Sequence, residues 1–266
     1  CNANIMECDT MNRNEIDLKN KAILHKDNSL NRLDVTFLKH IELSEYKKSN
    51  LLAYWINDFA KYHDEERIFD IAKSGIYSRG DVIKVNLGFN VGNEEGGLHY
   101  CVVLDKKNAK SYSTLTVVPL SSIKPSSKPR KTSVFLGDDI YVTLQKKNDE
   151  IRDTVQNYIN ICKVEIANLY TLPENTEEEK IIKNYKIQQI KNIINDNAEK
   201  LELSSKIEAE LNQMKRGTIA LINQITTISK QRIYNPKKDL DILSGIKISD
   251  EKMKLIDEKI KKLFIN

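Results

Sequence analysis

Glycine, proline and long apolar runs are all scarce in this chain of 266 residues. Its 9 glycines and 5 prolines are too few for a turn-rich all-β protein along the whole length. Long helices must therefore account for much of the chain. No apolar run approaches the roughly 18 residues of a membrane-spanning helix, so we expect no membrane segment.

Cysteine is also sparse, and its four copies form no pattern typical of a metal site. Cys1, Cys8, Cys101 and Cys162 contain no CxxC pair and no ligand cluster with the histidines. We expect reduced thiols in a cytoplasmic protein that needs no cofactor. Charge of one sign is not in large excess either, since 42 Lys and Arg oppose 38 Asp and Glu. This balance permits a local nucleic-acid surface without requiring one.

The pattern of residues divides the chain into four segments, 1–75, 76–145, 146–215 and 216–266. The first is interpreted as an N-terminal extension, partly disordered, with a short helix near 30–40 and an apolar stripe that predicts a helix over 43–62. The second holds six of the nine glycines and short β-branched runs that predict strands at 82–87, 100–104, 113–120 and 133–136. Their close spacing leaves no room for crossover helices, so the sheet should be mainly antiparallel.

The third segment contains no glycine and a single proline, and its apolar spacing predicts a helical hairpin. A turn at 172–175 precedes Thr176, which can cap the second helix with Glu179 in a capping box. Asn197 and Ser204 fall on the apolar stripe, where they either fix the register of the two helices or mark a rotation of the stripe. Gly217 is expected to end the second helix. The hairpin is either a partner-binding or dimerising arm, or it packs only on itself.

The β pattern resumes in the fourth segment, with predicted strands at 218–222 and 225–229. Ser249 and the acidic residues after it predict the start of a final helix. Because strands occur on both sides of the hairpin, we interpret the hairpin as an insertion into one β domain. The fold class expected from the sequence is therefore α+β.

Two blocks of sequence flank the predicted hairpin. The first contains Arg79-Gly80-Asp81-Val82, a G-x-E-x-G-G loop at 92–97 and the apolar strand at 100–104. The second contains an apolar strand, the pattern I-x-T-I-x-K-Q-R at 225–232, and the last helix. Over 79–137 and 215–265 these blocks resemble the MazF/PemK family of toxin endoribonucleases. The resemblance implies a small SH3-like antiparallel β barrel of the MazF/CcdB type with a C-terminal helix, usually a homodimer, and a cognate antitoxin protein.

The same resemblance implies metal-independent cleavage of single-stranded RNA, in which the 2′-hydroxyl attacks the adjacent phosphate. In the family, an Arg directly after the Gly-Gly-x loop does much of the work, helped by a Thr or Ser at the end of the next strand. Here His99 stands in the Arg position, and Ser122, with Ser121 beside it, stands in the hydroxyl position. Histidine can act as acid or base, whereas Arg is a permanent cation. The exchange of Arg for His is compatible with a different distribution of catalytic roles among the site residues, or with a weakened or non-catalytic member of the family.

Further candidates surround this pair, and each has a second, purely structural interpretation. Glu94 and Glu95 either read bases and act as a general base or only solvate their loop. Lys124, followed by other basic residues at 128, 130 and 131, either contacts RNA phosphates or only aids solubility. Asn223 and Gln224 are expected on a strand that faces the RNA groove, where their amides suit base edges. The alternative function is a non-catalytic binding module on the same fold, which inhibits DNA gyrase, as CcdB does, or binds RNA.

Overall fold

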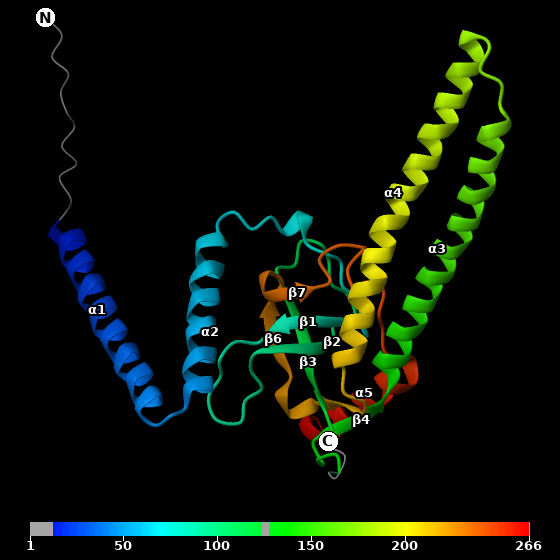
Figure 1. Ribbon diagram of the computed structural model, residues 1–266. Helices are drawn as coiled ribbons and strands as arrows, with labels where there is room; N and C mark the ends of the chain where they lie inside the picture. The colour runs from blue at the N-terminus through cyan, green and yellow to red at the C-terminus, as the bar shows by residue number, and fades with distance from the viewer. Residues whose placement is uncertain (1–12, 124–127, 266) are drawn as a thin grey trace, which may run out of the picture. The chain divides into compact units, whose positions relative to one another are not determined.

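The computed structural model describes residues 13–123 and 128–265, and the chain divides into two compact units, Cys1–Asp58 and Phe59–Asn266 (Figure 1). The first unit contains helix α1 (Arg13–Glu42) and most of α2 (Tyr46–Glu65). The helix over 43–62 is confirmed within a few residues. The expectation of only a short helix near 30–40 was wrong, because α1 is 30 residues long. No glycine or proline occurs between positions 13 and 65 to interrupt either helix.

The second unit is built on an antiparallel sheet. Its strands are β1 (Val82–Asn86), β2 (Leu98–Val103), β3 (Thr114–Ser122), β4 (Ser133–Gly137), β5 (Thr218–Leu221), β6 (Thr226–Ser229) and β7 (Ile233–Asn235). All six strands expected from the sequence are confirmed, and the short β7 is an addition. The strand order is β4-β5-β3-β2-β1-β7, with β6 paired to β3. The described residues therefore form a mixed α+β fold whose antiparallel sheet is open. The β barrel that was expected from the sequence is not closed in the described residues.

The two faces of the sheet carry separate hydrophobic clusters. Successive side chains of a strand point to opposite faces, so Val82 and Val102 join one cluster whereas Ile83 and Cys101 join the other. The first cluster also receives side chains from three helices and contains the larger share of the buried apolar residues. Because both faces are buried, the strands show continuous apolar runs in place of strict alternation.

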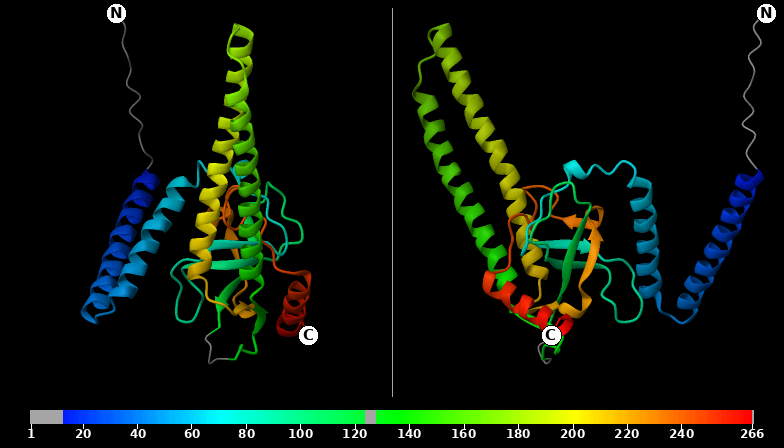
Figure 2. Two further views of the ribbon diagram at one scale, coloured as in Figure 1. Left: turned by 45° about the vertical axis from the view of Figure 1, so that its right-hand side comes forward. Right: turned by 180° about the vertical axis from the view of Figure 1, so that it is seen from behind.

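The helical hairpin consists of α3 (Asp139–Thr171) and α4 (Glu177–Gln213), which run side by side in both views of Figure 2. The capping box of Thr176 and Glu179 is confirmed. The hairpin begins seven residues earlier than expected, since α3 starts at 139 and not at 146. Its base lies in the first cluster of the sheet, to which α4 contributes Ile207 and Leu211. The hairpin is thus rooted in the same core as the strands.

Polar contacts reinforce the base of the hairpin. The Ser204 hydroxyl donates to Asn148 Oδ1 at 2.7 Å, and both side chains are buried between α3 and α4. Ser204, a polar residue on the apolar stripe of α4, therefore pairs with a residue of α3. Lys147 Nζ donates to the carbonyl oxygens of residues 241, 242 and 244 at 2.9, 3.0 and 2.8 Å, which fastens α3 to the loop after β7.

Helix α5 (Asp250–Phe264) follows Ser249 as expected and buries Met253 and Ile256 against the sheet. Arg79 joins this helix to the sheet, because its guanidinium donates to the Leu104 carbonyl and to the Asp257 carboxylate. The expected role of Gly217 as the end of α4 was wrong, since α4 ends at Gln213. Gly217 instead has φ +81°, and a Cβ there would lie 2.7 Å from Ile123 Cγ2, which restricts the position to glycine.

Candidate active site

The loop between β1 and β2 (residues 87–97) holds the first candidate residues. Its ends are joined by hydrogen bonds from Leu87 N to the Gly97 carbonyl at 2.8 Å and from Gly97 N to the Gly88 carbonyl at 2.6 Å. Gly97 has φ +84°, and a Cβ on Gly96 would lie 2.7 Å from the Gly88 oxygen. The Gly-Gly pair is therefore needed for the chain to turn back into β2 directly before His99.

His99 lies on β2, where it is opposite Val85 of β1 and partly buried. Its Nδ1 lies 3.1 Å from the Leu120 carbonyl oxygen and 3.6 Å from Glu95 Oε1. A carbonyl oxygen can only accept a hydrogen bond, so Nδ1 carries the proton in this contact. This tautomer leaves the lone pair of the neutral ring on Nε2. The Glu95 carboxylate can compensate the positive charge that the ring acquires when Nε2 takes a proton.

A cavity of about 350 Å³, here called the His99 cavity, contains His99 together with Ser121 and Ser122. The structure therefore brings the two candidate catalytic residues to one site. Ser122 is exposed at the end of β3 and lies opposite Thr218 of β5. The rest of the lining comes from β1, β2, β3, β5, the two hairpin helices and the two residues after α4: Lys84, Leu98, Tyr100, Leu120, Ile140, Glu210, Gln213, Met214, Lys215 and Thr218.

Three polar side chains of this cavity form a connected group. Glu210 of α4 accepts hydrogen bonds at Oε1 from Lys84 Nζ, at 2.7 Å, and from the Tyr100 hydroxyl. The ammonium of Lys84 also lies 5.1 Å from the centre of the Tyr100 ring. Burial raises the pKa of the Glu210 carboxyl, but the two hydrogen bonds and the Lys84 charge outweigh burial, so the net shift is downward. Burial and the adjacent Glu210 raise the pKa of Tyr100 far above its usual value. Glu210 is thus a carboxylate and Tyr100 a neutral phenol at neutral pH.

A second cavity of about 500 Å³, here called the Arg232 cavity, collects four of the other candidates: Glu94, Glu95, Asn223 and Gln224. Arg232 also lines it, with Nε donating to the Asn86 carbonyl at 2.8 Å. Burial lowers the pKa of this guanidinium. Glu95 links the two cavities, because its carboxylate also lies beside His99.

The expected strand position of Asn223 and Gln224 was wrong, since both lie in a 3₁₀ turn at Ile222–Gln224. The amide of Gln224 is used by the glycine loop: its Oε1 accepts from Glu95 N at 3.3 Å and its Nε2 donates to the Asn93 carbonyl at 3.2 Å. Gln224 therefore holds the loop in place, whereas Asn223 is exposed at the cavity. Glu94 is exposed and accepts from Val91 N at 3.3 Å, as a residue that stabilises its own loop would.

Comparison with known families gives an assignment for this region. Residues 78–195 match the model of a PemK-like, MazF-like toxin of type II toxin-antitoxin systems. This stretch, 118 of the 266 residues, is similar to that toxin family. The matched span contains β1 to β4, α3 and part of α4, and so includes His99 and Ser122. A search of curated proteins finds no match. A type II system, as the description of that model names it, pairs such a toxin with an antitoxin.

The predicted basic loop after Ser122 is only partly described, and Lys124 lies outside the described residues. Lys128, Arg130 and Lys131 are exposed between β3 and β4. None of the helices within 13–123 and 128–265 has the length and apolar character that crossing a membrane requires. Over the same residues, His, Cys, Asp and Glu form no group of three or more suited to a metal ion.

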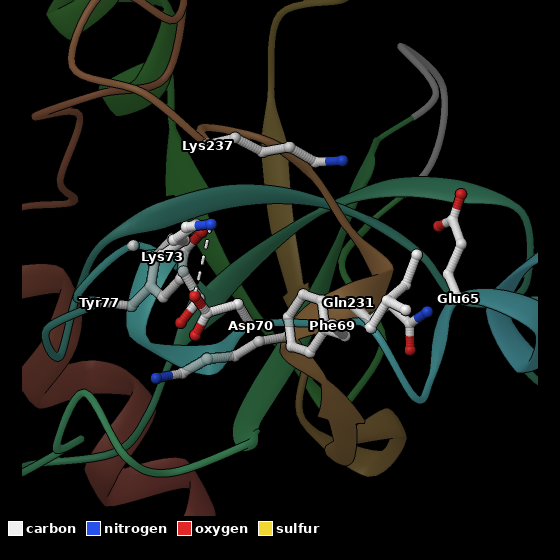
Figure 3. Close-up of a pocket in the computed structure, with 11 residues that line it drawn as sticks. Glu65, Phe69, Asp70, Lys73, Tyr77, Gln231 and Lys237 are labelled. Carbon is white, nitrogen blue, oxygen red and sulfur yellow. Dashed lines mark ion pairs between the residues drawn. The ribbon is translucent and has the colours of Figure 1, made fainter.

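A third cavity, of about 340 Å³, lies apart from the candidate residues and is shown in Figure 3. Phe69 lies beside Gln231 in this view, and Asp70 pairs with Lys73. Lys230 also lines the cavity and is only 4% exposed, and burial lowers its pKa. The lining mixes lysines with carboxylates, so no single class of ligand is indicated.

Among the polar residues of the two cavities, sequence reasoning missed Lys84, Tyr100, Glu210, Lys215 and Arg232. Arg232 ends the K-Q-R pattern, so the resemblance contained a signal for it. Tyr100 follows His99 directly in the sequence, but no pattern marked it as a functional residue. Glu210 had no signal, because it lies 110 positions from Tyr100 on a helix with many charged residues.

Proposed function

We propose that the toxin domain is an endoribonuclease that cleaves single-stranded RNA by attack of a 2′-hydroxyl on the adjacent phosphate. The observation that carries this proposal is the contact of His99 Nδ1 with the Leu120 carbonyl. It fixes the tautomer in which Nε2 can accept a proton, in a cavity that also contains Ser122. The proposal includes the SH3-like family fold with the hairpin as an insertion, and a homodimer.

The reaction can be written with the residues of the His99 cavity. The 2′ oxygen forms a bond to phosphorus while the bond from phosphorus to the 5′ oxygen breaks, which gives a cyclic phosphate and a 5′-hydroxyl end. His99 Nε2 takes the proton of the 2′-hydroxyl, and the leaving oxygen takes a proton from water. The resulting hydroxide then takes the proton from His99, which restores the neutral ring. The Ser122 hydroxyl and the Lys215 ammonium, which line the same cavity, donate to the phosphate oxygens as their charge grows.

The neighbouring Arg232 cavity suits the RNA chain beyond the cut. Arg232 supplies a cation for a backbone phosphate, and the exposed amide of Asn223 suits a base edge. The basic residues 128, 130 and 131 are further candidates for backbone contacts. Glu95 acts on His99 and not on RNA, since its carboxylate faces Nδ1.

The test is incubation of purified protein with mixed RNA in EDTA, comparing wild type with His99→Ala. We expect cleavage by wild type and a loss of about 100-fold or more in the variant, the usual effect of removing a general base. His63→Ala is the matched control, because this exposed histidine lies outside both cavities, with its ring against Phe59 and its Nδ1 3.4 Å from the Glu66 carboxylate. No cleavage, or equal cleavage by His99→Ala, refutes the proposal. RNA binding without cleavage supports the binding-module alternative.

A further inference from the structure

The hairpin contributes one wall of the His99 cavity. Glu210, Gln213, Met214 and Lys215 all come from the last turn of α4 or directly follow it. This part of α4 is held firmly, because Ile207 and Leu211 are buried in the core of the sheet. The wall is therefore a fixed part of the site.

Glu210 is the acidic member of this wall, and it has acceptor capacity to spare. A carboxylate has about four acceptor positions, of which Lys84 and Tyr100 occupy two, both on Oε1. About a fifth of its side chain is exposed, so a molecule in the cavity can reach it. The Lys84 charge and the two hydrogen bonds keep the group ionised, so it accepts hydrogen bonds and donates none.

The remaining surface of the cavity suits one nucleotide. Leu98 and Met214 give apolar surface for the face of a base, and Tyr100 adds an aromatic ring. His99 and the two serines lie in the same cavity, where a phosphate next to that base would be. The volume of about 350 Å³ is at the lower end of the range for small-ligand sites, which fits one nucleotide better than several.

We propose that Glu210 makes the His99 cavity a subsite for guanine, so that the hairpin determines which base lies next to the reacting phosphate. The location of the subsite beside the cut rests on the proposed ribonuclease function. Guanine is favoured because its Watson–Crick edge places two donors, N1–H and the N2 amino group, side by side. The other bases place an acceptor next to their donor, and that acceptor would face the carboxylate without a proton between them.

The substitution Glu210→Gln tests this recognition with little change in shape. The amide oxygen can still accept from Lys84 and Tyr100, but one acceptor of the group becomes a donor. With the amide oxygen held by Lys84 and Tyr100, the amide presents its NH2 group to the cavity where wild type presents Oε2, and so no longer accepts from the two donors of guanine. Glu208→Gln is the matched control. It lies two residues earlier on α4, pairs with Arg152 at 3.4 Å and does not line the cavity.

The probes are four labelled oligodeoxynucleotides of deoxyuridine that differ only in one central base. They lack the 2′-hydroxyl, so their binding is measured independently of cleavage. We expect wild type and Glu208→Gln to bind the guanine probe about tenfold more tightly than the others. In Glu210→Gln this advantage should fall below about twofold. If Glu210→Gln does not fold, Glu210→Asp keeps the charge, withdraws it by one methylene, and should also reduce the guanine advantage.

Wild type that binds none of the probes, or all four equally, overturns the proposal, and so does an unchanged order of affinity in Glu210→Gln. Cleavage of RNA by wild type is measured in parallel to separate this result from the proposed function. Cleavage without base discrimination refutes only the subsite. Discrimination without cleavage supports the subsite and refutes the ribonuclease.

Discussion

Replacing Ile207 by alanine should destabilise the whole second unit and not the hairpin alone. Ile207 lies on α4 but is fully buried in the cluster formed by the sheet, α3 and α5. Truncating a buried isoleucine to alanine costs 2–5 kcal/mol, through lost burial and the cavity that remains. Taking about 3 kcal/mol, and 2–4 °C per kcal/mol for a unit of this size, the melting temperature should fall by about 6–12 °C.

Ile194→Ala is the matched control, because Ile194 is on the same helix but is 50% exposed. Both substitutions change the helix propensity of α4 by the same amount, so the difference between the two variants in free energy of unfolding reports the effect of burial. Ile194→Ala should change the stability by no more than about 0.5 kcal/mol. Hydrogen exchange should show faster opening of β3 and β5 amides together with α4 in Ile207→Ala. Equal effects of the two variants, or faster exchange confined to the hairpin, would refute a common core.

Three further predictions concern one buried hydrogen bond, one carboxylate with a lowered pKa and one buried thiol. Ser204→Ala removes the donor to the buried Asn148 oxygen and should cost about 1–3 kcal/mol in denaturant unfolding; a loss below about 0.5 kcal/mol would show that the contact does not matter. Because the pKa of Glu210 is lower in the folded protein than in the unfolded chain, the ionised carboxylate stabilises the fold at pH values above the ordinary pKa of glutamate. This stabilisation is lost as the pH falls through the pKa of Glu210 in the folded protein. The difference in melting temperature between wild type and Glu210→Gln should therefore be larger near neutral pH than below about pH 4, and a constant difference would contradict the shift. Burial, followed by the nearby Glu95 charge, raises the pKa of Cys101 to about 12, so alkylation of this thiol, followed by mass spectrometry, should occur only on unfolding; rapid labelling of native protein would contradict its burial.

Most helices and strands could be predicted from the sequence, because the pattern of neighbouring residues determines them. The capping box at Thr176 and the six expected strands follow from neighbouring residues, and these features are present in the structure. The glycine loop and the K-Q-R block supported the family resemblance. The family model confirms it for 78–195, which includes the glycine loop, whereas the K-Q-R block at 225–232 lies outside the match. By contrast, α1 was underestimated because its polar composition was interpreted as disorder, although nothing in it breaks a helix.

The site was only partly predictable, because its residues meet through tertiary contacts. His99 and Ser122 could be placed together from the resemblance, since they lie near the ends of neighbouring strands. The contact of Glu210 with Lys84 spans 126 positions and depends on where α4 crosses the sheet, which no local pattern specifies. Likewise, the use of the Gln224 amide by the glycine loop depends on the 3₁₀ turn that replaced the expected strand.

The ends of the RNA products test the central claim most directly. A defined single-stranded RNA is incubated with wild-type protein in EDTA, and the ends at each cut are identified by mass spectrometry. Attack by the 2′-hydroxyl with His99 as the base predicts a 2′,3′-cyclic phosphate on one fragment and a 5′-hydroxyl on the other, with both absent in His99→Ala. Products with a 5′-phosphate, or intact RNA with the wild-type protein, would contradict the account.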